Sequence, residues 1–287
     1  MAYVVSSPGS CGEFIQGYAN GSSFMVTCPI NRYAKALVTE NTTEILPEKA
    51  KQAALRTLAY LGIKDQVPMV QLISSIPKGK GLASSTADIS AVSQAVALSC
   101  GRKLSAEEIA HIALSIEPSD ATFFEGIVQF DYRQGKLIRP MGLCPTMDIL
   151  IYDCGGEVDT MTFNSRNDLI SLQQSNEQEI AKALSLFEQG IRQQSIEDIG
   201  KAASISAFCN QKILYKKQLD DFYRVGVAAG GKGVVCAHSG TVLGLILPHG
   251  TDETPVRQAL EKEIRNITFL DYVSVTNQGM RIVASDS

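Results

Sequence analysis

The chain has 287 residues, a length that suits two domains better than one. Hydrophobic residues make up 45% of it and charged residues 20%, which excludes a disordered or fibrous protein. The net charge of −4, the absence of an apolar run near the roughly 18 residues of a membrane span, and the lack of a signal-peptide pattern predict neither nucleic-acid nor membrane partners. Because the seven cysteines are scattered without a CxxC pair beside only three histidines, we expect a cytoplasmic protein without a zinc site.

The first half of the chain predicts strands interleaved with helices. Strand patterns cover residues 3–7, 24–38 with a break at Pro29, 67–76, and a hairpin at 126–132 and 137–139. Apolar residues recur at helical spacing over residues 50–61 and 84–99. A third helix should begin after Ser105, where Glu108 completes a capping-box pattern. It should end near Glu117, because Pro118 disfavours helical geometry in the residue before it.

The second half begins near Pro145, which divides the chain into predicted domains of residues 1–145 and 146–287. Its strand patterns cover residues 147–153, 232–237, 241–247, 269–275 and 280–284. Helical patterns lie within the polar stretch 167–227 and over residues 254–264. Since strands and helices are interleaved in both halves, we expect an α+β fold.

Residues 76–88, with the sequence IPKGKGLASSTAD, carry the most chemical information. A predicted strand runs into a loop with two glycines and two lysines, and this loop opens a predicted helix. Gly79 and Gly81 allow backbone N–H groups to converge on an anion, and Lys78 and Lys80 add positive charge. Together with the free N–H groups at the start of the helix, this pattern predicts a phosphate-binding loop.

Two other types of phosphate loop fit this chain poorly. A Walker A loop needs Ser or Thr directly after its lysine, whereas glycine follows the Gly-Lys pairs at 79–80 and 231–232. The glycine spacing approaches the dinucleotide-binding fingerprint, which requires a strand ending in an acidic residue after the helix. Here residues 101–104 lead straight into another helix instead.

The loop resembles the Pro-x-x-x-Gly-Leu-Gly-Ser-Ser-Ala-Ala motif of the GHMP kinases. The residues that match in register are Pro77, Gly81, Leu82, Ser84, Ser85 and Ala87. Ala83 stands in place of the middle glycine of the motif, and Thr86 in place of its first alanine. Residues 8–13, PGSCGE, and 237–242, AHSGTV, partly resemble the first and third motifs of the family.

The resemblance implies an N-terminal domain like ribosomal protein S5 domain 2, a ferredoxin-like C-terminal domain, and ATP in the cleft between them. Within the family, residues 8–17, 27–30, 116–124 and 237–245 are similar to members that phosphorylate L-threonine for cobalamin biosynthesis. This implies ATP and Mg²⁺ as cofactors and L-threonine as the small-molecule substrate. Kinases of homoserine or another small alcohol, and a nucleotide-binding sensor without activity, are the alternatives.

The resemblance also implies roles for individual residues. The ATP phosphates would be bound by Pro77, Lys78, Gly79, Lys80, Gly81, Leu82, Ala83, Ser84, Ser85 and Thr86. Ser85 and Glu117 would hold Mg²⁺, and Asp120 would be the base for the substrate hydroxyl. A carboxylate just beyond a helix C-terminus is disfavoured by the helix dipole, so a metal gives Glu117 a reason to be there. As alternatives, Ser85 caps the helix that it begins and Asp120 caps the turn at 119–122.

An amino-acid substrate carries an ammonium and a carboxylate, so its pocket requires groups of both signs. From charge alone, we predict Glu13 for the ammonium and Arg32 for the carboxylate, with Ser10 as a hydrogen-bond partner. An exposed charge at a strand end is the alternative for Arg32. We expect Cys11 to be a packed thiol and not a nucleophile, because a catalytic cysteine needs a base beside it. We expect His238 to pack against the glycine loop.

Overall fold

The computed structural model describes residues 3–40, 42, 45–64, 66–156, 158, 162–163 and 165–284. In this part of the chain, ten strands form one sheet in the order β5-β4-β2-β1-β7-β8-β6-β9, while β3 pairs with β2 and β10 with β1. The strands are β1 (Tyr3–Ala19), β2 (Ser22–Val38), β3 (Val70–Ser74), β4 (Ile127–Phe130), β5 (Ile138–Gly142), β6 (Met147–Asp153), β7 (Gly233–Cys236), β8 (Val242–Pro248), β9 (Thr268–Ser274) and β10 (Arg281–Ala284).

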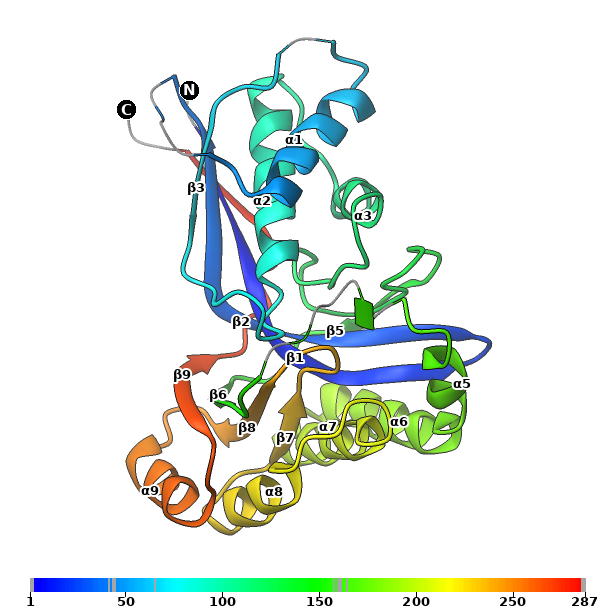
Figure 1. Cartoon of the computed structure of the whole chain (residues 1–287), viewed down its shortest axis with the longest axis vertical. Coiled ribbons are helices and arrows are strands. Elements are labelled where there is room, and N and C mark those ends of the chain that lie inside the picture. The colour runs from blue at the N-terminus through cyan, green and yellow to red at the C-terminus, as the bar shows by residue number, and fades with distance from the viewer. Residues whose placement is uncertain are drawn as a thin grey trace.

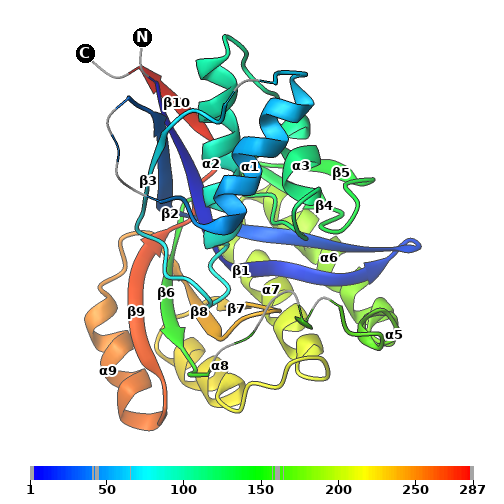
Figure 2. The same ribbon diagram turned by 45° about the horizontal axis from the view of Figure 1, so that its top comes forward.

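Helices cover this sheet in two groups, which confirms the predicted α+β class. They are α1 (Glu48–Tyr60), α2 (Ser84–Ser99), α3 (Ala106–Leu114), α5 (Leu169–Gln174), α6 (Glu177–Gln193), α7 (Ile196–Asn210), α8 (Leu219–Ala228) and α9 (Glu253–Glu263). Figures 1 and 2 both show α1–α3 on one side of the long β1–β2 ribbon and α6–α9 on the other. The predicted capping box is present at the start of α3. This helix ends at Leu114, so Glu117 lies in the turn beyond it.

β1 is much longer than the predicted strand at residues 3–7, because it continues through the first GHMP-like motif to Ala19. Proline and glycines inside this motif are usually strand breakers. Here the pairing of β1 with β2 absorbs them as register shifts after Pro8, Ser10 and Glu13. Such bulges bend a strand and re-aim its side chains, and they place this part of β1 beside the loop before α2.

The last strand returns to the first one. β10 runs antiparallel to the start of β1, with Tyr3 opposite Ala284 and Ser6 opposite Arg281. Both views show this C-terminal segment beside the N-terminal part of β1. The division at residues 145 and 146 stays a prediction, since the two halves share one sheet.

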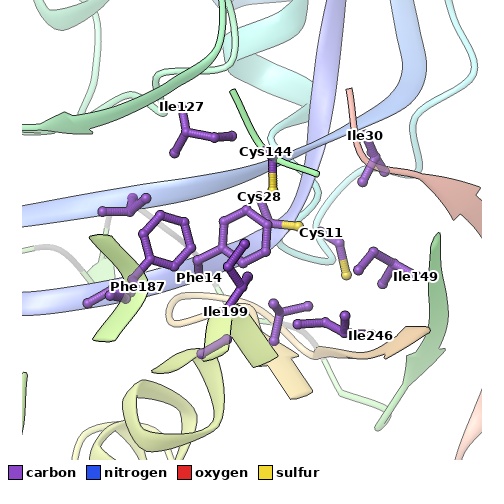
Figure 3. Close-up of a cluster of buried hydrophobic side chains, with 14 of the residues drawn as sticks. Cys11, Phe14, Cys28, Ile30, Ile127, Cys144, Ile149, Phe187, Ile199 and Ile246 are labelled. Carbon is purple, nitrogen blue, oxygen red and sulfur yellow. The ribbon is translucent and has the colours of Figure 1, made fainter. Parts of the chain in front are cut away.

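The largest buried cluster joins the middle of the sheet to α6 and α7 (Figure 3). Phe14 from β1 and Phe187 from α6 lie with their ring centroids 5.2 Å apart. Cys11, Cys28 and Cys144 pack in the same cluster as small apolar side chains. This packing fixes the motif-bearing part of β1 between the two groups of helices.

Candidate functional site

A pocket of about 480 Å³ opens at the N-terminal end of α2, a volume that suits a small-molecule ligand. Segments far apart in the sequence line it. They contribute Glu13, Pro47, Glu48, Lys49, Ala50, Lys78, Gly79, Gly81, Leu82, Ala83, Ser84, Ser85, Thr86, Asp88, Glu117, Pro118, Asp120, Val158 and Ser239. The structure therefore brings Glu13, Glu117 and Asp120 to one pocket with most of the predicted phosphate loop.

The backbone of the loop is arranged for an anion. Gly79 and Gly81 have φ values of 71° and 86°, the left-handed region that glycine adopts at little cost. Ala83 is also left-handed, with φ 54°, which explains why the family motif has glycine at this position. It is the N-cap of α2 and gives no side-chain hydrogen bond, so the first N–H groups of the helix stay free of a capping side chain. The alternative role of Ser85 as this cap is therefore wrong.

The first and third motifs bind the backbone of the phosphate loop through hydrogen bonds. The N–H of Gly12 donates to the carbonyl of Gly81 at 3.2 Å, and the N–H of Thr241 donates to the carbonyl of Lys80 at 3.0 Å. A Cβ atom on Gly81 would lie 2.3 Å from the Cβ of Ala237, so only glycine allows this approach. The three segments that resembled family motifs thus form one structural unit.

Glu117 is a buried carboxylate with two partners at the edge of the pocket. The hydroxyl of Ser85, in the first turn of α2, donates to its Oε1 atom. The ammonium of Lys49, near the start of α1, lies 2.5 Å from its Oε2 atom. The hydroxyl of Ser85 and the carboxylate of Glu117 are both oxygen ligands of the kind that Mg²⁺ prefers. Two such groups in contact match the one or two protein ligands that Mg²⁺ usually takes.

Asp120 lies in the turn beyond α3, three residues after Glu117, and packs against Thr86 in the first turn of α2. Its N–H donates to Oγ1 of Thr86 at 3.2 Å, and its Oδ1 atom is buried with no hydrogen-bond partner among the described residues. Burial, followed by the nearby carboxylates of Glu13 and Glu117, raises the pKa of Asp120 to about 8. A carboxyl with a pKa near neutrality can take up a proton from a substrate.

Glu13 projects from the bulged part of β1 and pairs with His238 in the turn between β7 and β8. The backbone N–H of His238 and its ring Nδ1 each lie 2.9 Å from Oε2 of Glu13. Burial opposes a charged ring, yet the Cys236 sulfur and the Glu13 carboxylate raise the pKa of His238. In the same turn, Ala237 and Gly240 lie against Gly81, whereas the packing of His238 against the glycine loop stays a prediction.

Several predicted residues lie outside the pocket lining. Lys80 forms an ion pair with Asp153, with Nζ 2.8 Å from Oδ2. Arg32 is held by Asp271 through two bonds of 2.5 and 2.7 Å. The structure does not bring Arg32, Pro77, Lys80 or Ser10 into the lining. The backbone N–H of Ser10 instead donates to the carbonyl of Leu82, and this hydrogen bond ties β1 to the loop.

Sequence reasoning missed Lys49, and it did not find His238 as the partner of Glu13. Lys49 is the second residue of α1, which was predicted to start at residue 50, and nothing local marks its ammonium as a partner for Glu117. Cys11, by contrast, is the expected packed thiol, because it is fully buried and burial raises its pKa. The Phe123–Phe124 pair also lies in a hydrophobic core.

Comparison with known proteins decides the family. Residues 48–125 match the model of the GHMP kinases N terminal domain. L-threonine kinase of Citrobacter freundii is 30% identical over 248 residues, which cover 85% of this chain and 86% of that protein. L-threonine kinase of Salmonella typhimurium is 32% identical over 251 residues, covering 85% of this chain and 82% of that protein. The chain belongs to the GHMP kinase family.

Solved structures share the fold of this GHMP kinase. Methanococcus jannaschii mevalonate kinase matches with a TM-score of 0.70 at 16% identity, over 95% of this chain and 98% of that one. Homoserine kinase from Cytophaga hutchinsonii matches with a TM-score of 0.70 at 19% identity, over 98% and 97%. This GHMP kinase therefore uses ATP and a small alcohol as substrates. Among the described helices, none has the length and apolar character to cross a bilayer.

Proposed function

We propose that this GHMP kinase transfers the γ-phosphoryl group of ATP to the hydroxyl of L-threonine, giving O-phospho-L-threonine and ADP for the side chain of cobalamin. The observation that carries the proposal is the position of Asp120. Its unpartnered Oδ1 atom lies at the pocket that the phosphate loop forms. The two L-threonine kinases that cover most of the chain support the choice of substrate.

The reaction needs an anion cradle and a base. The loop residues 78–86, except Lys80, line the pocket and would bind the triphosphate through backbone N–H groups and Lys78. The hydroxyl oxygen of the substrate forms a bond to the γ-phosphorus as the bond from that phosphorus to the β–γ bridging oxygen breaks. The hydroxyl proton passes to the carboxylate of Asp120, and ADP leaves.

Ser85 and Glu117 would hold Mg²⁺. The residues present fit this ion, because a hydroxyl and a carboxylate already touch at the pocket edge and both are hard oxygen ligands. When bound, the ion supplies positive charge against the phosphate oxygens. Lys49 occupies the second oxygen of Glu117 in the structure and supplies positive charge to the same carboxylate.

Glu13 is the proposed partner of the substrate ammonium, since it is a pocket carboxylate to which the metal and base assignments give no other role. Arg32 as partner of the substrate carboxylate stays a prediction, and its guanidinium would have to leave Asp271 to act so. We also propose a cytoplasmic location, which the free state of all seven cysteines supports.

The test is ADP release with Mg²⁺ and ATP against L-threonine, L-serine, L-homoserine and mevalonate in parallel. Strong turnover with L-threonine supports the proposal. Turnover restricted to another alcohol keeps the kinase chemistry and overturns the substrate. Bound ATP with no turnover on any alcohol would favour a sensor that has lost the reaction.

A further inference from the structure

His238 lies next to the pocket but outside its lining, and its side chain is nearly inaccessible, at 3% exposure. A group so placed cannot touch the reacting atoms. It touches Glu13 instead, through both its backbone N–H and its ring, across 225 positions of sequence. Of the groups that the His238 side chain binds, Glu13 is the one that lines the pocket, so we expect the side chain to act on the reaction through Glu13.

The contacts of the ring identify which nitrogen carries a proton. Nδ1 lies 2.9 Å from Oε2 of Glu13 and 3.1 Å from the carbonyl oxygen of Cys236. A carbonyl oxygen can only accept, and Oε2 already accepts the backbone N–H of His238. The two nearest neighbours of Nδ1 are thus acceptors, and the Cys236 sulfur is more distant at 3.8 Å, so Nδ1 must be protonated and donate.

The other side of the ring is held as well. Nε2 lies 3.1 Å from Oγ of Ser206 on α7. This Oγ atom accepts the backbone N–H of Gln16 at 3.0 Å, so the hydroxyl proton of Ser206 can turn to the ring. The imidazole is fixed between α7 and β1, and this fixes the direction of its Nδ1–H.

Two N–H groups therefore converge on one oxygen of Glu13, and no hydrogen bond from the described residues reaches the other oxygen, Oε1. Glu13 lines the pocket, together with the carboxylates of Glu117 and Asp120. Without donors on Oε2, like-charge repulsion would turn the Glu13 carboxylate away from Glu117 and Asp120. With them, the carboxylate stays in place and keeps one oxygen for a ligand.

We propose that His238 is a positioning residue, which holds Oε2 of Glu13 so that Oε1 receives the ammonium of an amino-acid substrate. The inference rests on the proposed function only in requiring a substrate with an amino group. His238 would set the affinity for that amino group and would leave the binding of ATP unchanged.

The test uses two variants of similar shape. His238→Asn keeps an N–H donor near the position of Nδ1, whereas His238→Leu has nearly the shape of Asn and no donor. For His238→Leu we expect the KM for the hydroxy amino acid to rise about 10–100-fold, the loss of one charge-assisted hydrogen bond, with the KM for ATP within about threefold of wild type. His238→Asn should recover most of this loss.

A purely structural role would not distinguish substrates. We therefore compare L-threonine with 3-hydroxybutyrate, which has no amino group. Wild type should prefer the amino acid strongly, and His238→Leu should lose this preference as Glu13→Gln does. An equal loss on both substrates, an unchanged KM in His238→Leu, or equal damage in His238→Asn would overturn the proposal.

A spectrum of the wild-type enzyme covers the case in which His238→Leu fails to fold. The chain has three histidines, so ¹⁵N-labelled imidazoles give few signals. The protonated Nδ1 of His238 should shift in Glu13→Gln and on addition of the amino acid, but not on addition of 3-hydroxybutyrate. No shift in either case would overturn the proposal.

Failure of the proposed function gives a different result. If wild type phosphorylates L-serine or L-homoserine and not L-threonine, the same comparison is made with that amino acid and its analogue without the amino group. Loss of the preference for the amino acid in His238→Leu would then support the role of His238, and an unchanged preference would overturn it. If wild type phosphorylates only alcohols without an amino group, the role of His238 is overturned.

Discussion

The two walls of the active-site pocket are built in different ways. The phosphate loop is one continuous stretch whose proposed phosphate ligands are backbone N–H groups, and Gly79, Gly81 and Ala83 in it have left-handed conformations. The facing wall consists of Glu13, Glu117 and Asp120, which come from two segments more than 100 residues apart in the sequence. Each of these carboxylates depends on a side chain or turn from elsewhere for its position.

The difference shows which substitutions each wall tolerates. The loop accepts alanine in place of the motif glycine at position 83, because the required φ is costly but accessible to alanine. The facing wall should have less freedom, since each of its carboxylates has a single proposed role. Changes in the facing wall should therefore alter chemistry and cation binding, and changes in the loop should alter nucleotide affinity.

The largest effect is expected from Asp120→Asn. The amide cannot take up the hydroxyl proton, so turnover should fall by about 10²–10⁴-fold while ATP still binds. The measurement is kcat with saturating ATP and substrate, together with calorimetric ATP binding. A variant within threefold of wild-type turnover would show that Asp120 is not the base.

The same substitution should stabilise the fold. The pKa of Asp120 is raised to about 8 in the folded state, above its value in the unfolded chain, so its contribution to stability is lost as pH rises toward 8. Asparagine avoids this loss. The Tm of Asp120→Asn should exceed that of wild type by a few degrees at pH 8 and by less at pH 5. A difference that does not depend on pH would contradict the raised pKa.

The pH dependence of the wild-type reaction should follow the ionisation of Asp120. Asp120 acts as base only when ionised, so kcat/KM should fall about tenfold per pH unit below a pKa near 8 and level off above it. The pH profile of kcat should have its midpoint at a lower pH than that of kcat/KM, because the ammonium of the bound substrate and the metal favour the ionised form of Asp120. A flat kcat/KM profile between pH 6 and 9 would remove Asp120 from this role.

Glu117→Gln should raise the Mg²⁺ concentration for half-maximal activity by about tenfold or more, since a charged oxygen ligand becomes neutral. Glu125→Gln is the matched control, because Glu125 is exposed and follows Glu117 by eight positions. Equal metal titrations for the two variants would mean that Glu117 does not hold the ion.

The smallest effects are expected from substitutions of the two loop lysines, and these effects should distinguish Lys78 from Lys80. Lys78 lines the pocket, whereas Lys80 is bound to Asp153 on β6. Lys78→Ala should raise the KM for ATP about tenfold through loss of a charge-assisted contact. Lys80→Ala should change this KM by less than about threefold and lower the Tm, as Asp153→Asn should. The reverse order of effects would mean that Lys80 leaves Asp153 to bind phosphate.

Much of the local structure could be predicted from the sequence. The bounds of α2, the capping box at Ser105 and the helices of residues 167–227 follow from apolar spacing and cap residues, which act within a few positions. The phosphate loop could be predicted for the same reason, because its glycines, lysines and helix start are consecutive. The length of β1 could not be predicted, since pairing with β2 overrides the breakers at Pro8 and Gly9.

By itself, the sequence determined the α+β class, the backbone of the loop and the presence of the three carboxylates that we propose for the reaction. Only the tertiary structure decided their partners: His238 for Glu13, Lys49 for Glu117, and Asp153 for Lys80. The physical reason is range. Backbone geometry and helix caps are set by neighbours in the chain, whereas a charged side chain is stabilised by whatever partner the packing of the whole chain brings within about 3 Å of it.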